Sequence, residues 1–285
     1  MSKKTIALSF DLEYWYCGTF LKKYLPSNVK SIPEIYPEVL DKILLLLKRY
    51  NAQATFFVLT SIVEKNPDLI KKIADLGHEI ASHGNNHELI SAMNPDDFKK
   101  DLIEAKQLIK KITGQNDIGF RAPNFSITPS SAWALKTLSD AEYKYDSSYH
   151  PYQIKKTGFI EKRPLIAYSN GKSRIIECPI ATLNIAGLNI PVSGGFYFRL
   201  LSYTLFSWLL DKACQKNMPI LYFHCMDLHS SKPNIKIPWA IRLIKYWGIK
   251  KSMKKFEKLI ADYQCISINK LINASHEDIA DQPSN

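Results

Sequence analysis

Residues 54–87, ATFFVLTSIVEKNPDLIKKIADLGHEIASHGNNH, contain the pattern that decides the fold. The apolar run at 54–60 predicts a buried strand. Residues 66–77 predict a helix, because a proline stands at its start and a glycine follows its end. HEIASH, at 78–83, predicts a second strand that leads directly into a histidine-rich turn. A strand, a helix and a strand in this order are typical of a parallel sheet.

The same alternation continues on both sides of this stretch. TIALSF, at 5–10, predicts a buried strand, and later strands are predicted around RIIECPI, PILYFHCMDL and CISI. The further predicted helices cover residues 36–50, 95–112, 129–139, 199–216 and 250–262. Six to seven strand–helix units favour a barrel over an open sheet. We expect one catalytic domain over 1–272, with 148–196 as an elaboration of it, and a polar tail over 273–285.

The chain of 285 residues has a formal charge of +11, which first suggests a nucleic-acid partner. Only six of the 38 basic residues are arginine, and no helix-turn-helix, RNP or zinc-finger pattern accompanies the charge, so we expect no nucleic acid. The basic residues are densest in 241–260, IRLIKYWGIKKSMKKFEKLI. That segment is either a solvated lysine-rich helix face or, because aromatic and isoleucine residues stand among the lysines, a peripheral membrane surface.

Cysteine usage and the N-terminus indicate the compartment. The five cysteines are odd in number and form no C-x-x-C pair, which fits free thiols in a reducing environment. The apolar run near the start is interrupted by Asp11, so we expect no secretory signal. No apolar run approaches the roughly 20 residues of a membrane span. We therefore expect a cytoplasmic protein, with the inner membrane face as an alternative.

Ionisable side chains stand where three predicted strands end. Asp11 and Glu13 follow the first strand, His83 and His87 follow the third, and His224 ends a late strand. The carboxyl ends of parallel strands meet on one face of a barrel, so these side chains can meet there. Two imidazoles and a carboxylate suit Zn²⁺ with one position left for water. The H-x-x-x-H pair alone is more typical of two surface histidines, and the acidic residues at the end of the first strand strengthen the case for a metal.

Four motifs together resemble a known family. SFDLE (9–13), SHGNNH (82–87), FRAPNFS (120–126) and YFHCMDL (222–228) are similar, in order and separation, to motifs of the polysaccharide deacetylase family. This is the NodB-homology, or carbohydrate esterase family 4, group, in its branch with Asp-x-Glu or Asp-x-Asp in the first motif. The resemblance covers nearly the whole chain.

The resemblance implies a distorted (β/α)₇ barrel and a hydrolase of non-peptide carbon–nitrogen bonds. The expected reaction is metal-dependent removal of an N-acyl group, N-acetyl in the first instance, from an amino sugar. By position in the motifs, Asp11 is the expected general base and His224 the expected general acid. Arg121 is expected to orient Asp11 and to keep it ionised.

The resemblance also implies the metal ligands Glu13, His83 and His87. Zn²⁺ is the first expectation, and Co²⁺, Ni²⁺ and Fe²⁺ stay open because a nitrogen and oxygen shell suits several metals. Many family members have two adjacent aspartates in the first motif. Here Leu12 occupies the second place, so the longer Glu13 side chain has to reach the metal.

Candidate substrate residues lie in the motif loops and in SGGFYFR (193–199), because aromatic faces stack on sugar rings. SGGFYFR stands where the family usually has a Trp-and-Asp motif that tunes the acid histidine, and no such motif is recognisable. The candidates are Asn124, Phe125, Tyr14, Trp15, Tyr197 and Arg199.

The leading functional hypothesis is an enzyme of surface polysaccharide or glycolipid biosynthesis that deacylates an N-acylated amino sugar, nucleotide-linked or lipid-linked. One alternative is a deformylase of a lipid-linked amino sugar. Another is a carbohydrate-binding pseudoenzyme that has lost turnover.

Overall fold

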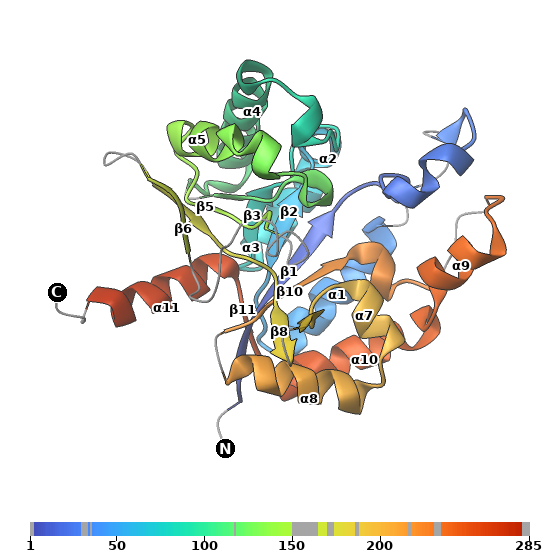
Figure 1. Ribbon diagram of the computed structural model, residues 1–285. Coiled ribbons are helices and arrows are strands. Elements are labelled where there is room, and N and C mark those ends of the chain that lie inside the picture. Colours follow the sequence, from blue (N-terminus) through green and yellow to red (C-terminus); the bar gives the residue numbers. More distant parts are fainter. Residues whose placement is uncertain are drawn as a thin grey trace.

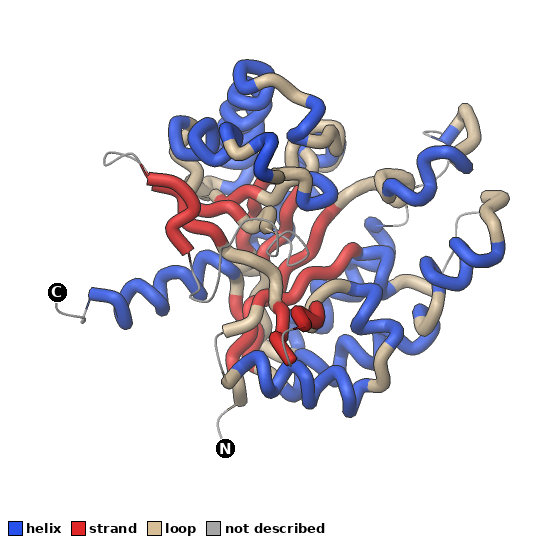
Figure 2. Tube along the Cα trace, viewed as in Figure 1, coloured by secondary structure: helices blue, strands red, loops and turns tan. Residues whose placement is uncertain are grey.

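One curled β-sheet with helices around it forms the body of the protein (Figures 1 and 2). We describe it from a computed structural model, in which no helix of the described chain is long and apolar enough to cross a membrane. The described residues are 3–29, 34, 36–116, 118–149, 165–169, 174–185, 188–215, 218–230 and 235–280.

The main sheet has the strand order β10-β1-β2-β3-β4-β5-β7-β6. In that order the strands are Ile220–His224, Thr5–Leu12, Thr55–Val58, Glu79–Ser82, Gly119–Phe120, Tyr145–Asp146, Arg174–Glu177 and Leu165–Ser169. Neighbours from β10 to β7 are parallel, and β6 is antiparallel to β7. β11 (Gln264–Ile266) pairs with the start of β1. β8 (Thr182–Ile185) and β9 (Leu188–Pro191) form a separate hairpin.

The sheet curls until its two ends approach each other. Cys178, directly after β7, donates its N–H to Asp146 of β5, and Ala181 donates to the carbonyl of Ile220 in β10 at 2.9 Å. Backbone hydrogen bonds thus connect the last parallel strand to the opposite edge. The seven parallel strands form a distorted (β/α)₇ barrel, which confirms the fold expected from the sequence.

Local sequence accounts for the helices. The helices are α1 Tyr36–Arg49, α2 Thr60–Lys65, α3 Pro67–Asp75, α4 Pro95–Thr113, α5 Trp133–Asp140, α7 Gly195–Leu200, α8 Tyr203–Cys214, α9 Trp239–Tyr246, α10 Ile249–Asp262 and α11 Ile268–Ala280, with a 3-10 helix, η1, at Thr19–Tyr24. α4 is typical. Asn94 caps it by accepting the Asp97 N–H, and Gly114 ends it with φ at 76°, a left-handed conformation that glycine adopts without strain.

Aromatic packing holds the strands beneath the site. The ring of Phe10 in β1 lies 5.1 Å from Phe56 of β2, 6.0 Å from Phe223 of β10 and 5.8 Å from Phe256 of α10. All four side chains are fully buried. This cluster fixes β1 between its neighbours, and β1 carries Asp11.

Three boundaries differ from the sequence prediction. The basic segment 241–260 forms parts of two helices, because Gly248, at φ 70°, interrupts it. Helix α11 extends through Ala280, past residue 273, where the polar tail was predicted to begin. Within 148–196, β7 is a strand of the barrel, because its buried RIIE run pairs with β5. The remaining residues of the predicted elaboration are described only in part.

Candidate active site

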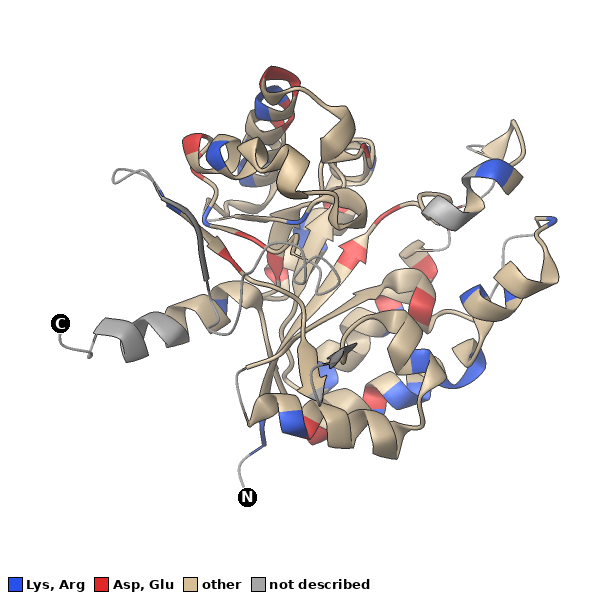
Figure 3. Cartoon of the chain, in the orientation of Figure 1, with Lys and Arg blue, Asp and Glu red and all other residues tan. Residues whose placement is uncertain are grey.

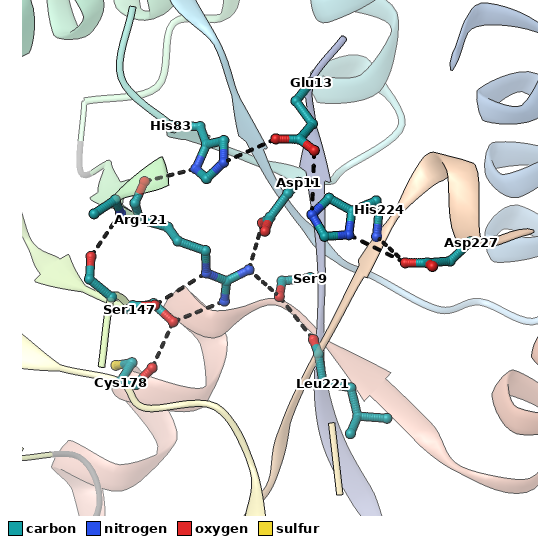
Figure 4. Close-up of polar contacts among 12 residues, drawn as sticks. Ser9, Asp11, Glu13, His83, Arg121, Ser147, Cys178, Leu221, His224 and Asp227 are labelled. Atoms are coloured by element: carbon teal, nitrogen blue, oxygen red, sulfur yellow. Dashed lines mark hydrogen bonds and ion pairs between the residues drawn. The ribbon is translucent and has the colours of Figure 1, made fainter. Parts of the chain in front are cut away.

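The ionisable residues singled out in the sequence gather at the carboxyl ends of the parallel strands. Asp11 in β1 is the register partner of His224 in β10, so both side chains lie on the same face. His83 directly follows β3, and Arg121 directly follows β4. Figure 4 shows these side chains converging with Glu13 at one end of the barrel.

Asp11 and Arg121 form a buried ion pair. Arg121 Nη1 donates to Asp11 Oδ1 at 2.7 Å and to Ser9 Oγ at 3.0 Å, and the guanidinium also donates to Ser147. Arg121 is fully buried and its charge lies 4.0 Å from the centre of the Phe57 ring. Burial by itself raises the pKa of Asp11, but Arg121 and the nearby histidines outweigh burial and lower the pKa below its ordinary value. Asp11 is therefore a carboxylate at neutral pH.

Glu13, His83 and His87 form a cluster suited to a metal ion. One ligand atom of each lies within 4.8 Å of the others. Glu13 Oε2 is 2.6 Å from His87 Nε2 and 3.9 Å from His83 Nε2, so the longer carboxylate does reach both histidines. This buried oxygen has no aligned hydrogen-bond donor among the described residues, despite the short distance to His87. A shared cation would satisfy these atoms, so the three residues fit a divalent metal.

The backbone fixes the orientation of His83. Its Nδ1 lies 2.8 Å from the carbonyl of Arg121, which accepts the Nδ1 proton and leaves the lone pair on Nε2. Burial lowers the pKa of His83 to about 4, so the ring is neutral. Burial raises the pKa of Glu13, but His224 and His87 outweigh it, and the net shift is downward. His87 has a positive φ of 60°, a strained backbone conformation that the turn imposes at this ligand position.

His224 lies between two carboxylates. Its Nδ1 is 3.3 Å from Asp227 Oδ2, and its Nε2 is 3.5 Å from Glu13 Oε1. Burial by itself lowers the pKa of His224, but Glu13 and Asp227 outweigh it and raise the pKa to about 9. A cation held by Glu13 would offset the charge of that carboxylate, whereas Asp227, at 3.3 Å from Nδ1, would still raise the pKa of His224.

Asp227 is itself held in place by the SGGFYFR segment. Arg199 Nε donates to Asp227 Oδ1 at 3.1 Å, and Arg199 Nη1 donates to the carbonyls of Lys245 and Trp247. A Cβ atom on Gly195 would overlap with the Asp227 carboxylate, so only glycine fits there. The chain thus supplies an aspartate partner for His224 from within YFHCMDL, although no such partner was recognisable in the sequence.

The Asp227→Asn variant is expected to lose activity at lower pH than the wild type. A general acid works only while protonated, and removing the Asp227 charge lowers the pKa of His224. The alkaline limb of the kcat/KM profile should move down by on the order of one pH unit. The exposed Asp75→Asn variant is the control and should keep the wild-type profile. An unmoved limb in Asp227→Asn would contradict the pairing.

Three of the predicted substrate residues lie elsewhere than expected. Trp15 is 2% exposed and packs with Leu21 and Ile235, so its ring is not available to a sugar. Tyr14 is buried and stacks on Tyr16 at 5.2 Å. Arg199 is buried against Asp227. Direct sugar binding by these three residues stays a prediction, and in this structure local packing and the ion pair occupy their side chains.

The other three candidates stay near the site. Asn124 is exposed and Phe125 half-buried, and both have a φ of 52°, a strained turn placed directly after Arg121. The Phe125 ring packs edge-on against Tyr222, two residues before the acid histidine in β10. Tyr197 is half-buried. Their role in sugar binding stays a prediction.

A further polar network behind Arg121 was not found from the sequence. Ser147 donates to the carbonyl of Cys178 and accepts from Arg121, and Ser148 accepts the N–H of Ala122 and donates to Asp146. These serines hold the RAP segment against β5 and the chain after β7.

Fold and cluster together define a class of protein: an α/β barrel with a carboxylate–histidine site at the ends of its strands. The family model for polysaccharide deacetylase matches residues 1–145, and a model described as a domain of unknown function (DUF3473) matches residues 147–273. The chain belongs to the polysaccharide deacetylase family.

Curated relatives share parts of the chain. A peptidoglycan-N-acetylglucosamine deacetylase from Bacillus cereus is 33% identical over 126 residues, 43% of this chain and 44% of that protein. The peptidoglycan-N-acetylglucosamine deacetylase PgdA of Listeria monocytogenes is 26% identical over 171 residues, 53% of this chain and 35% of that protein. The chain thus spans about half or less of the length of these relatives.

Solved structures share the fold. A Mycobacterium smegmatis protein assigned as a polysaccharide deacetylase has a TM-score of 0.61 and 16% identity, covering 100% of this chain and 94% of that chain. The Bacillus subtilis peptidoglycan deacetylase PdaC has a TM-score of 0.51 and 16% identity, covering 98% and 95%. A CE4 family pseudoenzyme from Bacillus anthracis has a TM-score of 0.50 and 15% identity, covering 95% and 66%.

Proposed function

We propose that this protein is a metal-dependent N-deacetylase of an amino sugar. The observation that carries the proposal is the arrangement of Asp11, His224 and the Glu13–His83–His87 cluster on one face of the barrel. Membership of the polysaccharide deacetylase family supports the same reaction. Relatives named as deacetylases of N-acetylglucosamine in peptidoglycan support an N-acetylated sugar as the substrate class.

Glu13, His83 and His87 would hold the metal, with Zn²⁺ as the first choice and Co²⁺, Ni²⁺ or Fe²⁺ as alternatives for this nitrogen and oxygen donor set. When bound, a divalent cation polarises an acyl carbonyl and lowers the pKa of a water molecule. Metal ligands must be deprotonated to bind a cation, and the neutral His83 ring and the anionic Glu13 carboxylate meet this condition.

Asp11 would act as the general base. It is ionised, and Arg121 holds one of its oxygens, so the carboxylate keeps a fixed direction while it accepts a proton from water. Arg121 would act as a positioning residue. The exposed turn at Asn124 would offer its backbone N–H to the oxyanion, because the Phe125 N–H already donates to the carbonyl of Ala122.

His224 would act as the general acid. An amine leaves an amide only when it is protonated, and Glu13 and Asp227 raise the pKa of His224 so that its ring carries a proton to donate. Asp11 and His224 are register partners on neighbouring strands, so base and acid would flank the same substrate atom. The side chain of His224 is 35% exposed, which leaves it accessible to a leaving group.

The sugar, its carrier and the compartment are the finer parts of the proposal. We place the reaction in surface polysaccharide or glycolipid assembly, on a nucleotide-linked or lipid-linked amino sugar. Five cysteine thiols without disulfides support a reducing compartment, hence the cytoplasm. A deformylase would use the same residues, because a formamide needs the same base and acid.

The test is amine release from matched N-acetylated and N-formylated amino sugars, with the protein stripped of metal and then reloaded with Zn²⁺. Release from the acetylated sugar that depends on metal is the expected result. Release from the formylated sugar alone would favour the deformylase. Sugar binding without release of either acyl group by metal-loaded protein would identify a pseudoenzyme.

A further inference from the structure

Helix α9 presents its apolar residues to solvent. Trp239 is 78% exposed, Ile244 56%, Trp247 50% and Leu243 46%. Residues 239, 243 and 247 are four apart and therefore lie along one stripe of the helix. Large apolar side chains gathered on one exposed face mark an interaction surface rather than ordinary surface composition.

The opposite face of α9 packs on the protein. Ile241 lies against the small cluster of Trp15, Leu21 and Ile235, and Lys245 lies near the carboxylates of Glu13 and Asp227. The α9 segment therefore partly buries a lysine and exposes two tryptophans. An ordinary surface helix does the opposite, because it packs its apolar face on the core and turns its charged residues to water. The packing of Ile241 and Lys245 on the protein thus fixes which face of α9 is exposed.

Basic residues surround this apolar stripe. Between residues 236 and 258 the chain has eight lysines or arginines and one acidic residue, Glu257, which pairs with Arg49. Figure 3 shows basic residues on α9 and along the neighbouring part of α10. The exposed basic residues are Lys236, Arg242, Lys250, Lys251, Lys254 and Lys258.

We propose that α9 docks the protein on an anionic membrane surface, with its tryptophan stripe in the interface and the lysines against lipid phosphates. Tryptophan prefers the boundary between headgroups and acyl chains, and each nearby lysine adds attraction to anionic lipid. A helix with an apolar face bordered by lysines is the arrangement that lies in this plane.

The position of α9 links docking to the site. Figure 1 shows α9 and η1 projecting from the barrel, and Leu21 of η1 packs with Ile235. Trp15 in that cluster is two residues from Glu13, and Arg199 joins the end of α9 to Asp227. Docking through α9 would therefore bring the site close to the bilayer. Resting on the proposed deacetylase function, this favours an amino sugar carried on a lipid.

The test is co-sedimentation with vesicles of phosphatidylcholine, with and without a quarter of phosphatidylglycerol. We expect binding to the anionic vesicles at low salt and release as salt is raised. The Trp239→Ser/Trp247→Ser double variant should bind at least about tenfold more weakly, because two apolar side chains no longer enter the interface. Trp208→Ser, which removes an equally exposed tryptophan from α8, is the matched control and should bind like the wild type.

Two outcomes overturn the proposal: no preference for anionic vesicles, or equal binding by the double variant. Concentration-dependent dimers that the double variant abolishes, without vesicle binding, would instead assign the face to a second copy of the chain. Thermal unfolding of each variant checks that it folds. Binding is measured with the Asp11→Asn protein as well, so that a failure of docking is distinguished from a failure of the catalytic assignment.

Discussion

The Asp11→Asn variant is expected to release amine about 10³-fold more slowly than the wild type while binding the sugar with similar affinity. Asparagine keeps the oxygen that accepts the hydrogen bond from Arg121 but cannot take a proton from water. The loss should therefore appear in kcat and leave ground-state binding intact. The measurement is steady-state amine release with metal-loaded protein, beside calorimetric titration with the sugar.

The control for Asp11→Asn is Asp68→Asn. Asp68 is an exposed carboxylate in the first turn of α3. This variant should keep the wild-type turnover, because the Asp68 side chain faces solvent. If Asp11→Asn retained more than about a tenth of the wild-type rate, Asp11 would not be the base.

The Glu13→Ala variant is expected to bind Zn²⁺ at least about 100-fold more weakly and to lose amine release. Glu13 supplies the only carboxylate of the described cluster, and its Oε2 lies within reach of both histidines. Without it only the two imidazoles of the cluster remain, and they hold a divalent cation less tightly. Calorimetric titration of metal-free protein measures the affinity directly.

Glu88→Ala is the matched control for Glu13→Ala, because Glu88 adjoins His87 but is exposed. Its affinity for Zn²⁺ should equal that of the wild type. An unchanged affinity in Glu13→Ala would show that the two histidines hold the metal without the Glu13 carboxylate. That result would contradict the assignment of the Asp-x-Glu motif.

Much of the fold could be predicted because its signals are local. Buried strands such as TIALSF and ATFFVLT are short apolar runs between helices with clear ends, and their periodicity is visible in the sequence. The convergence of Asp11, Glu13, His83 and His224 followed from parallel pairing, which places strand ends on one face. The motif resemblance then gave each residue a role.

The remaining site features depend on contacts that no local pattern shows. Asp227 reaches His224 because a 3-10 turn brings position i+3 back to the ring, and Gly195 leaves room for the carboxylate. Trp15 was predicted at the substrate because it follows Glu13. Its burial depends on Ile235, which is more than 200 residues away in the chain.

The proposed base and the proposed acid reach the site from different halves of the chain. The segment matched as polysaccharide deacetylase carries Asp11, Glu13, His83, His87 and Arg121, whereas the segment matched as a domain of unknown function carries His224 and Asp227. Strand β10 pairs with one edge of β1. The first segment alone would therefore leave that edge of an apolar strand unpaired, and such an edge is prone to aggregation. Substitutions confined to the second segment would remove proton donation and leave the ion-binding residues in place.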